Sequence, residues 1–207
     1  MIRLVLLVVG VGVFVYFALR WRRDRREDAL ARARSAFFLV RPAPPEQGPP
    51  SAQMKAVSLQ DGLVGLRVPQ SWTEEIVAGG YAARASSSRR FRAEARSVAR
   101  PEVTVATLAE GFRESPEGRK GRVDVLPNKR VLMKHVRDGA EDTKVGLTYC
   151  WSLAAVRPSD EVVVAELSFS VPLDAADAIT EDDLALLERE IQAAVVAEAD
   201  QKAAPLP

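Results

Sequence analysis

The first hydrophobic feature of the chain is an uninterrupted apolar run near its start. Residues 4–19 read LVLLVVGVGVFVYFAL and contain no charged side chain. As a helix rising ~1.5 Å per residue, this run is about 24 Å long, and the arginines at its two ends can reach the headgroups of a bilayer with a ~30 Å hydrocarbon layer. No small-x-small processing site follows directly, so the pattern favours an uncleaved transmembrane helix over a signal peptide.

Five arginines after the apolar run set the expected orientation. They are Arg20, Arg22, Arg23, Arg25 and Arg26, whereas only Arg3 precedes the run. Because Lys and Arg accumulate on the cytoplasmic side of membrane spans, we expect a single-pass protein of a bacterial-type inner membrane with its domain facing the cytoplasm. The very short N-terminal tail leaves a periplasmic domain as the alternative. The lipid bilayer is thus the first expected partner, through residues 4–19.

The distribution of prolines divides the rest of the chain. Helix formers continue past Leu19 without Gly or Pro until Pro42, which predicts an anchor and basic juxtamembrane helix over residues 1–40. Residues 41–53 contain five prolines and a glycine, a composition typical of a semi-extended linker. A globular domain is then expected over residues 54–200, with a tail at 201–207.

Short β-type runs dominate this domain. Two of them, residues 54–60 and 63–69, flank an Asp61-Gly62 turn and predict a hairpin. Further strands are predicted at residues 72–77, 81–86, 91–96, 130–137, 144–156 and 161–171. Because short connections separate the last three, we expect them to form an antiparallel meander.

Apolar side chains at helical spacing indicate two helices in the domain. The first covers residues 104–114 between two prolines, and a basic loop is expected after it at 118–121. The second starts from Thr180 as N-cap and presents Leu184, Leu187, Ile191 and Val195 on one face. The predicted fold class is therefore α+β, with an antiparallel sheet and two helices after a transmembrane helix.

The domain resembles a known protein family. The segment 65–72, GLRVPQSW, is similar to the strand-Pro-x-x-Trp opening of the PsbP-like and DcrB-like α/β sandwich proteins, and the order of elements over about residues 55–198 resembles theirs. The resemblance implies a non-catalytic binding or chaperone-like scaffold, in several cases attached to complexes at membranes. It implies no site residues. Unlike the lipoprotein members, this chain has no cysteine directly after its apolar run.

Charge and composition narrow the function classes. Residues 1–53 carry nine Lys and Arg against four Asp and Glu, a net +5, and the remainder carries 20 against 24, a net −4. Because a nucleic-acid binder carries its positive charge on its folded part, no nucleic-acid partner is expected. The single His and single Cys argue against a zinc site and a disulfide. No phosphate-binding or dinucleotide-binding motif occurs, so we expect no cofactor and no metal.

The candidates for catalysis are few. His135 lies in a predicted strand without a committed partner, and Cys150 lies between Tyr149 and Trp151 in an apolar strand, where a thiol behaves as a small hydrophobe. We interpret both as structural and assign no catalytic residue. The rival hypothesis is a carboxylate-dependent hydrolase that uses a pair among Asp138, Glu141 and Asp142, although their segment is typical of a turn.

The most distinctive feature of the domain is the group of arginines in and beside the strand predicted at residues 91–96. Arg90, Arg92 and Arg96 are the candidate face for an anionic partner, unless they form a solvated face balanced by the acidic segment 174–200. Trp72 and Trp151 are expected in the core. Together these features predict a membrane-anchored, non-catalytic protein-interaction module with an unidentified protein partner. A chaperone-like binder of apolar segments is the alternative within the same class.

Overall fold

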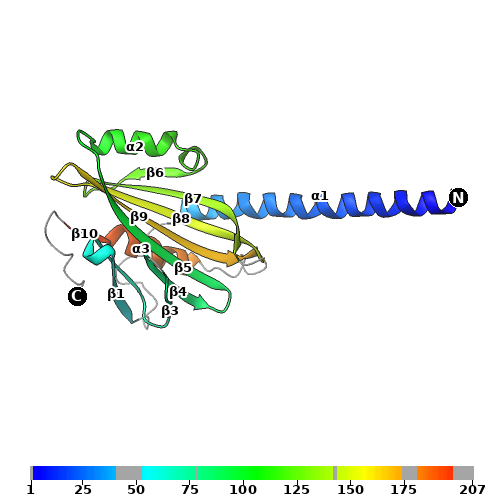
Figure 1. Ribbon diagram of the computed structural model, residues 1–207, viewed down its shortest axis with the longest axis horizontal. Coiled ribbons are helices and arrows are strands. Elements are labelled where there is room, and N and C mark those ends of the chain that lie inside the picture. Colours follow the sequence, from blue (N-terminus) through cyan, green and yellow to red (C-terminus); the bar gives the residue numbers. More distant parts are fainter. Residues whose placement is uncertain (1, 41–52, 78, 142–143, 174–180, 198–207) are drawn as a thin grey trace.

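The described part of the chain forms three α-helices and two antiparallel sheets (Figure 1). The computed structural model describes residues 2–40, 53–77, 79–141, 144–173 and 181–197, and at 2–18, 22, 140–141, 144–145 and 181–182 it describes the backbone without the side chain. The helices are α1 (Ile2–Leu39), α2 (Val105–Glu114) and α3 (Glu181–Ala193). An α+β fold with an antiparallel sheet is therefore confirmed.

The larger sheet has seven strands in the order β3-β4-β5-β9-β8-β7-β6. Their bounds are β3 (Thr73–Glu75), β4 (Tyr81–Ser86), β5 (Arg89–Ala99), β6 (Arg122–Val125), β7 (Arg130–Glu141), β8 (Lys144–Val156) and β9 (Glu161–Pro172). The predicted meander is confirmed, because β8 pairs with both β7 and β9. The opening hairpin forms a separate small sheet, in which β2 (Val64–Pro69) pairs with β1 (Met54–Leu59) and with β10 (Val195–Val196).

Two short strands were not predicted from the sequence. Strand β6 pairs with β7 after the basic 118–121 segment, part of which forms a short 3₁₀ turn. Val195, expected on the closing helix, instead pairs with Gly65 in β10, because α3 ends at Ala193. The buried Arg130 guanidinium donates to the carbonyl oxygens of Gln192 and Ala194, and so satisfies groups that a helix end leaves without partners. Thr180, the expected N-cap, lies outside the described residues.

The α2 helix follows its sequence signals closely. The Thr104 hydroxyl accepts from the backbone N–H of Thr107, and the Thr107 hydroxyl accepts in turn from the backbone N–H of Thr104. This reciprocal capping box fixes the start of the helix one residue after the predicted boundary.

One face of the large sheet is buried, and the other is open except where α2 packs on β6, β7 and β8. Along β5, Phe91, Ala93 and Ala95 are buried, whereas the intervening Arg92 and Glu94 are exposed. The buried face packs against α3 and the small sheet. Trp72 stacks on Phe169 with ring centroids 5.9 Å apart, and Trp151 is fully buried, so the prediction that both tryptophans belong to the core is confirmed.

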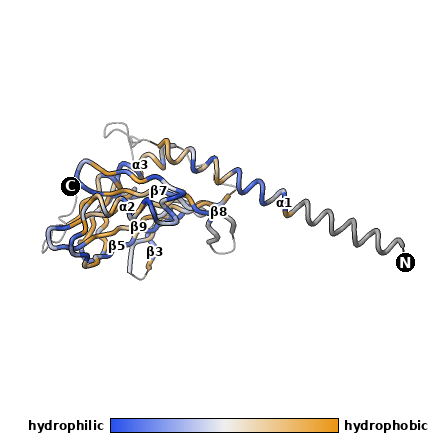
Figure 2. The backbone as a smooth tube through the Cα atoms, turned by 90° about the horizontal axis from the view of Figure 1, so that it is seen from above, coloured by the Kyte–Doolittle hydropathy of each residue, from blue (hydrophilic) through white to orange (hydrophobic). Residues whose placement is uncertain are grey.

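The end of α1 is part of the same core. Phe37 is fully buried, and its ring meets those of Tyr149 and Trp151 edge-on, with centroids 5.2 and 5.0 Å apart. The core therefore includes residues that precede the proline-rich segment. From this docked end α1 runs out of the domain toward its N-terminus (Figure 1), and Figure 2 shows its hydrophilic stretch in blue where it leaves.

The predicted span at residues 4–19 lies, apart from Leu19, outside the described side chains. Among the side chains that are described, no helix offers a stretch long and apolar enough to cross a bilayer.

Candidate functional site

The open face of the large sheet is a polar surface built from two cross-strand rows. Strand register places Arg137, Thr148, Ser170, Arg90 and Arg84 in one row, across β7, β8, β9, β5 and β4. The neighbouring row contains His135, Cys150, Ser168, Arg92 and Ala82 in the same strand order, followed by Glu75 of β3. Because alternate residues of a strand share one face, these side chains lie together although the sequence scatters them. We call these two rows the basic end of the open face.

Arginines dominate the charge of the basic end. Glu75 ion-pairs with Arg84 and, at 2.5 Å, with Arg90. The hydrogen bond from Arg84 and the nearby Arg90 charge hold the pKa of Glu75 below its usual value, so one full negative charge lies between two arginines. Arg92 and Arg137 form no ion pair with any other described side chain. Four arginines therefore face one described carboxylate in these rows.

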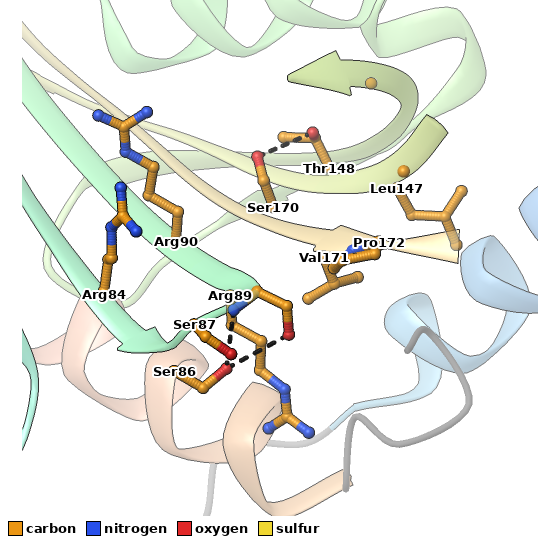
Figure 3. Close-up of a pocket in the computed structure, with 13 residues that line it drawn as sticks. Arg84, Ser86, Ser87, Arg89, Arg90, Leu147, Thr148, Ser170, Val171 and Pro172 are labelled. Carbon is orange, nitrogen blue, oxygen red and sulfur yellow. Dashed lines mark hydrogen bonds between the residues drawn. The ribbon is translucent and has the colours of Figure 1, made fainter. Parts of the chain in front are cut away.

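A cavity of about 210 Å³ opens at this end of the sheet (Figure 3). Its polar floor contains the hydroxyls of Thr148 and Ser170, which lie 3.0 Å apart. Arg84 and Arg90 rise on the same side as these hydroxyls, whereas Arg89 points to the other side of the sheet and pairs with Asp183 of α3 at 2.7 Å. The remaining walls come from the serine turn between β4 and β5, 86–88, and from the β7–β8 and β9 strand ends.

A glycine keeps the cavity floor in place. A Cβ atom at Gly139 would lie 2.4 Å from the Thr148 hydroxyl oxygen, far inside van der Waals contact. The Thr148 side chain therefore occupies the space that a larger residue at 139 would fill. Gly139 is opposite Gly146 in the register, so this pair presents no side chain to the cavity, whereas the neighbouring Leu147 of β8 lines it.

His135 and Cys150 are directly opposite each other on β7 and β8, an arrangement the sequence analysis did not anticipate. Together with Arg92 and Arg137 they line a second cavity of about 260 Å³ on the open face. Burial lowers the pKa of His135, and burial raises the pKa of the Cys150 thiol to about 11. A nucleophilic Cys–His pair needs a thiolate and an imidazolium, and this environment disfavours both charged forms.

The predicted anionic-partner residues are divided between two parts of the face. Arg90 and Arg92 lie at the basic end, whereas Arg96 lies farther along β5 and pairs with Glu166 of β9 at 2.8 Å. The basic end also contains Arg84 and Arg137, which the sequence analysis did not select. Only the strand register brings them into one row with Arg90.

The other predicted candidates lie elsewhere. On α1, Arg23 pairs with Glu27 at 2.8 Å and the Arg25 guanidinium lies 4.0 Å from the centre of the Trp21 ring. The described side chains of Arg20 and Arg26 are exposed, and that of Arg22 is not described. Of the three carboxylates in the rival hypothesis, Asp138 is exposed on β7, whereas Asp142 and the side chain of Glu141 lie outside the described residues.

Comparisons with known proteins give a distant likeness. No family model matches the sequence, and no curated protein matches it. A crystal structure of a protein from Bacteroides thetaiotaomicron VPI-5482 is similar at 14% identity and a TM-score of 0.50; the alignment covers 72% of this chain and 50% of that one. This chain thus spans about half the length of that protein.

Two further solved structures are similar at lower scores. LpqN, involved in cell envelope biogenesis of Mycobacterium tuberculosis, has 14% identity and a TM-score of 0.43, with 66% of this chain and 88% of that one covered. The Saccharomyces cerevisiae Ran-binding protein Mog1p has 12% identity and a TM-score of 0.42, with 72% and 97% covered. At these values the matches amount to a distant likeness to the Mog1/PsbP-like α/β sandwich fold, which says nothing about function.

Proposed function

We propose that this chain is a single-pass membrane-anchored, non-catalytic protein-interaction module that binds its partner through the open face of the large sheet. The observation that carries the proposal is the composition of that face. Hydroxyls and arginines dominate its basic end, the carboxylates of Glu94 and Glu166 lie farther along it, and its only His and Cys have pKa shifts that oppose nucleophilic chemistry. Such a surface recognises polar or anionic groups, so it favours an interaction module over a chaperone-like binder of apolar segments.

The anchor rests on the apolar run at residues 4–19. Insertion into lipid removes these apolar side chains from water, which is favourable. If the run is helical, its backbone N–H and C=O groups keep their hydrogen bonds inside the helix, so none is lost on insertion. The backbone of α1 is helical from Ile2 to Leu39 without a break, and Phe37 fastens its far end to the core. A bilayer around residues 4–19 would therefore hold the domain in a fixed orientation through α1, and not only through the semi-extended linker predicted at residues 41–53.

The arginine-rich stretch at residues 20–26 supports a cytoplasmic domain at a bacterial-type inner membrane, with a periplasmic domain as the alternative. Protease added to right-side-out vesicles should then spare residues 54–207. Digestion of that region in intact vesicles would place the domain on the outer side.

Anchoring is tested by flotation of the full chain on a density gradient after an alkaline carbonate wash. Wild type should float with the membranes. The double variant Val9→Arg/Val13→Arg should stay at the bottom, because each charge at a helix centre costs ~2.5–3.5 kcal/mol of insertion free energy. The double variant Val9→Leu/Val13→Leu is the matched control and should float. Extraction of the wild-type protein by carbonate would contradict the proposed membrane anchor.

The binding surface is tested by crosslinking in cells. A photoreactive amino acid at Ser168, on the open face, should give a discrete protein adduct, whereas the same residue at the exposed Ser71 should not. Equal adducts from both positions, or none from Ser168, would contradict the assigned surface. Hydrolase activity that disappears in Asp138→Asn or Asp142→Asn would favour the enzymatic rival.

A further inference from the structure

We infer that the basic end of the open face binds the phosphate group of an anionic membrane lipid. This inference rests on the proposed membrane anchor and names a ligand for the 210 Å³ cavity in Figure 3. Three properties of the cavity support this ligand: its hydrogen-bond donors, the balance of charge around it, and its position relative to α1.

The donors suit a tetrahedral oxyanion. Phosphate oxygens accept hydrogen bonds, and arginine guanidinium groups and hydroxyls are the side chains that most often supply them. The cavity offers the Thr148 and Ser170 hydroxyls on its floor and the arginines 84 and 90 on one wall. Its volume of about 210 Å³ exceeds the ~30 Å³ share of a water molecule several times over, so a phosphate group fits.

The balance of charge favours an anion. The basic end has four arginines and, among the described residues of its two rows, one carboxylate, that of Glu75. Arg137 flanks Thr148 on β7, and Arg90 flanks Ser170 on β5, so positive charge lies on both sides of the hydroxyl pair. An acidic group entering between them meets a favourable potential from each side.

The position of the cavity selects a lipid as the source of the phosphate. The cavity lies where β9 and β4 end and where β7 connects to β8, and Figure 1 shows these ends pointing in the direction in which α1 leaves the domain. With the anchor in a bilayer, this end of the sheet faces the headgroups. The basic stretch of α1 lies between the domain and the span, so it extends the same positive surface toward the membrane.

The test uses the full chain in a non-ionic maltoside micelle. Short-chain dihexanoyl phosphatidylglycerol, dihexanoyl phosphatidylcholine and inorganic phosphate are titrated separately by calorimetry. The anionic lipid should bind about tenfold more tightly than the zwitterionic one, because choline carries a positive charge toward the arginines. Equal affinity for the two lipids overturns the inference. If inorganic phosphate binds as tightly as phosphatidylglycerol, the inference that the phosphate group comes from a lipid is wrong.

Variants locate the binding at the cavity. Arg84→Gln/Arg90→Gln should weaken phosphatidylglycerol binding about tenfold, since charge-assisted hydrogen bonds from the arginine wall of the cavity are lost. Ser170→Ala changes no charge and should weaken it about threefold. Arg96→Gln is the matched control: Arg96 lies on the same face and strand system and is also ion-paired, but outside the cavity, so affinity should stay within about twofold. Equal losses in Arg96→Gln and the double variant would contradict the assigned site.

The membrane anchor and the lipid site are tested by separate measurements. Calorimetry with short-chain lipid measures binding at the cavity whether or not residues 4–19 span a bilayer. Flotation measures membrane insertion whether or not the cavity binds lipid. Thermal unfolding of each variant, expected within a few degrees of wild type for these exposed or half-buried positions, confirms that affinity changes arise from the site.

Discussion

The Nζ atom of Lys134 lies 3.1 Å from Oε1 of Glu188, and both side chains are at most 3% exposed. The pair joins β7 to α3 through the core. The Trp151 indole N–H donates to the other carboxylate oxygen at 2.8 Å, and the Phe37 ring centroid lies 5.4 Å from the Lys134 ammonium. Charges buried this deeply are tolerated because each has a charged partner and further polar or aromatic contacts.

Removing one member of this pair should be costly. Glu188→Ala leaves the Lys134 ammonium buried without its carboxylate, and we expect the free energy of unfolding in urea to fall by about 3–5 kcal/mol. Glu114→Ala, at the exposed end of α2, is the control and should change it by less than about 0.5 kcal/mol. The double variant Lys134→Met/Glu188→Leu should recover much of the loss. A loss below about 1 kcal/mol in Glu188→Ala would contradict the assigned burial of the pair.

Phe37 should control whether α1 is docked. Phe37→Ala removes a fully buried ring, and we expect a loss of about 3–5 kcal/mol in the free energy of unfolding. Trypsin should also cut faster at Arg32 and Arg34, because the last turns of α1 lose their attachment. Leu39→Ala is the matched control, since Leu39 is 78% exposed on the same helix end. Identical cleavage rates in wild type and Phe37→Ala would mean that α1 is held by other contacts.

Cys150 should react slowly in the folded protein. With its pKa raised to about 11 by burial, the thiolate fraction at pH 8 is about 100-fold smaller than for a thiol of pKa 9. Iodoacetamide should therefore alkylate Cys150 at least about 100-fold faster in 8 M urea than in buffer. Rapid, stoichiometric modification of the folded chain would contradict this prediction and would favour a nucleophilic role for Cys150.

The stability of the domain should fall as the solution is acidified through the titration of His135. Burial lowers the pKa of His135, while Glu117 opposes this shift and Arg137 and Arg34 add to it. The unfolded chain, with a His pKa of ~6.5, then takes up a proton before the folded one does, so folding is disfavoured as the pH falls below ~6.5. Urea denaturation at pH 7.5 and 5.5 should show a smaller difference in His135→Gln than in wild type. Equal differences would show that His135 titrates alike in both states.

Much of the fold follows from local sequence signals. Alternation of Phe91, Ala93 and Ala95 with charged residues defines β5 and its two faces, and prolines bracket α2. The failures occur where tertiary contacts decide. Val195 continues the helical pattern of α3, but hydrogen bonds from Arg130 end the helix and β2 recruits the next residues as a strand.

The candidate site is less visible in the sequence than the fold. Arg137, Thr148, Ser170, Arg90 and Arg84 come from five strands, and only the pairing register aligns them. The same holds for His135 and Cys150, whose adjacency depends on the β7–β8 register. Phe37 is a similar case: its sequence position before five prolines suggests separation from the domain, but an apolar side chain at a helix end gains more by packing on Trp151.

The most direct test of the account measures which end of the domain lies near the membrane. In a Cys150→Ala background, a fluorophore is attached at Ser87→Cys, in the β4–β5 turn beside the cavity, or at Ser159→Cys, in the β8–β9 turn at the opposite end of the sheet. The full chain is then reconstituted into nanodiscs that contain a spin-labelled lipid headgroup. We expect strong quenching at position 87 and weak quenching at position 159. Equal quenching at the two positions, or stronger quenching at 159, would contradict the placement of the cavity on the membrane side of the domain.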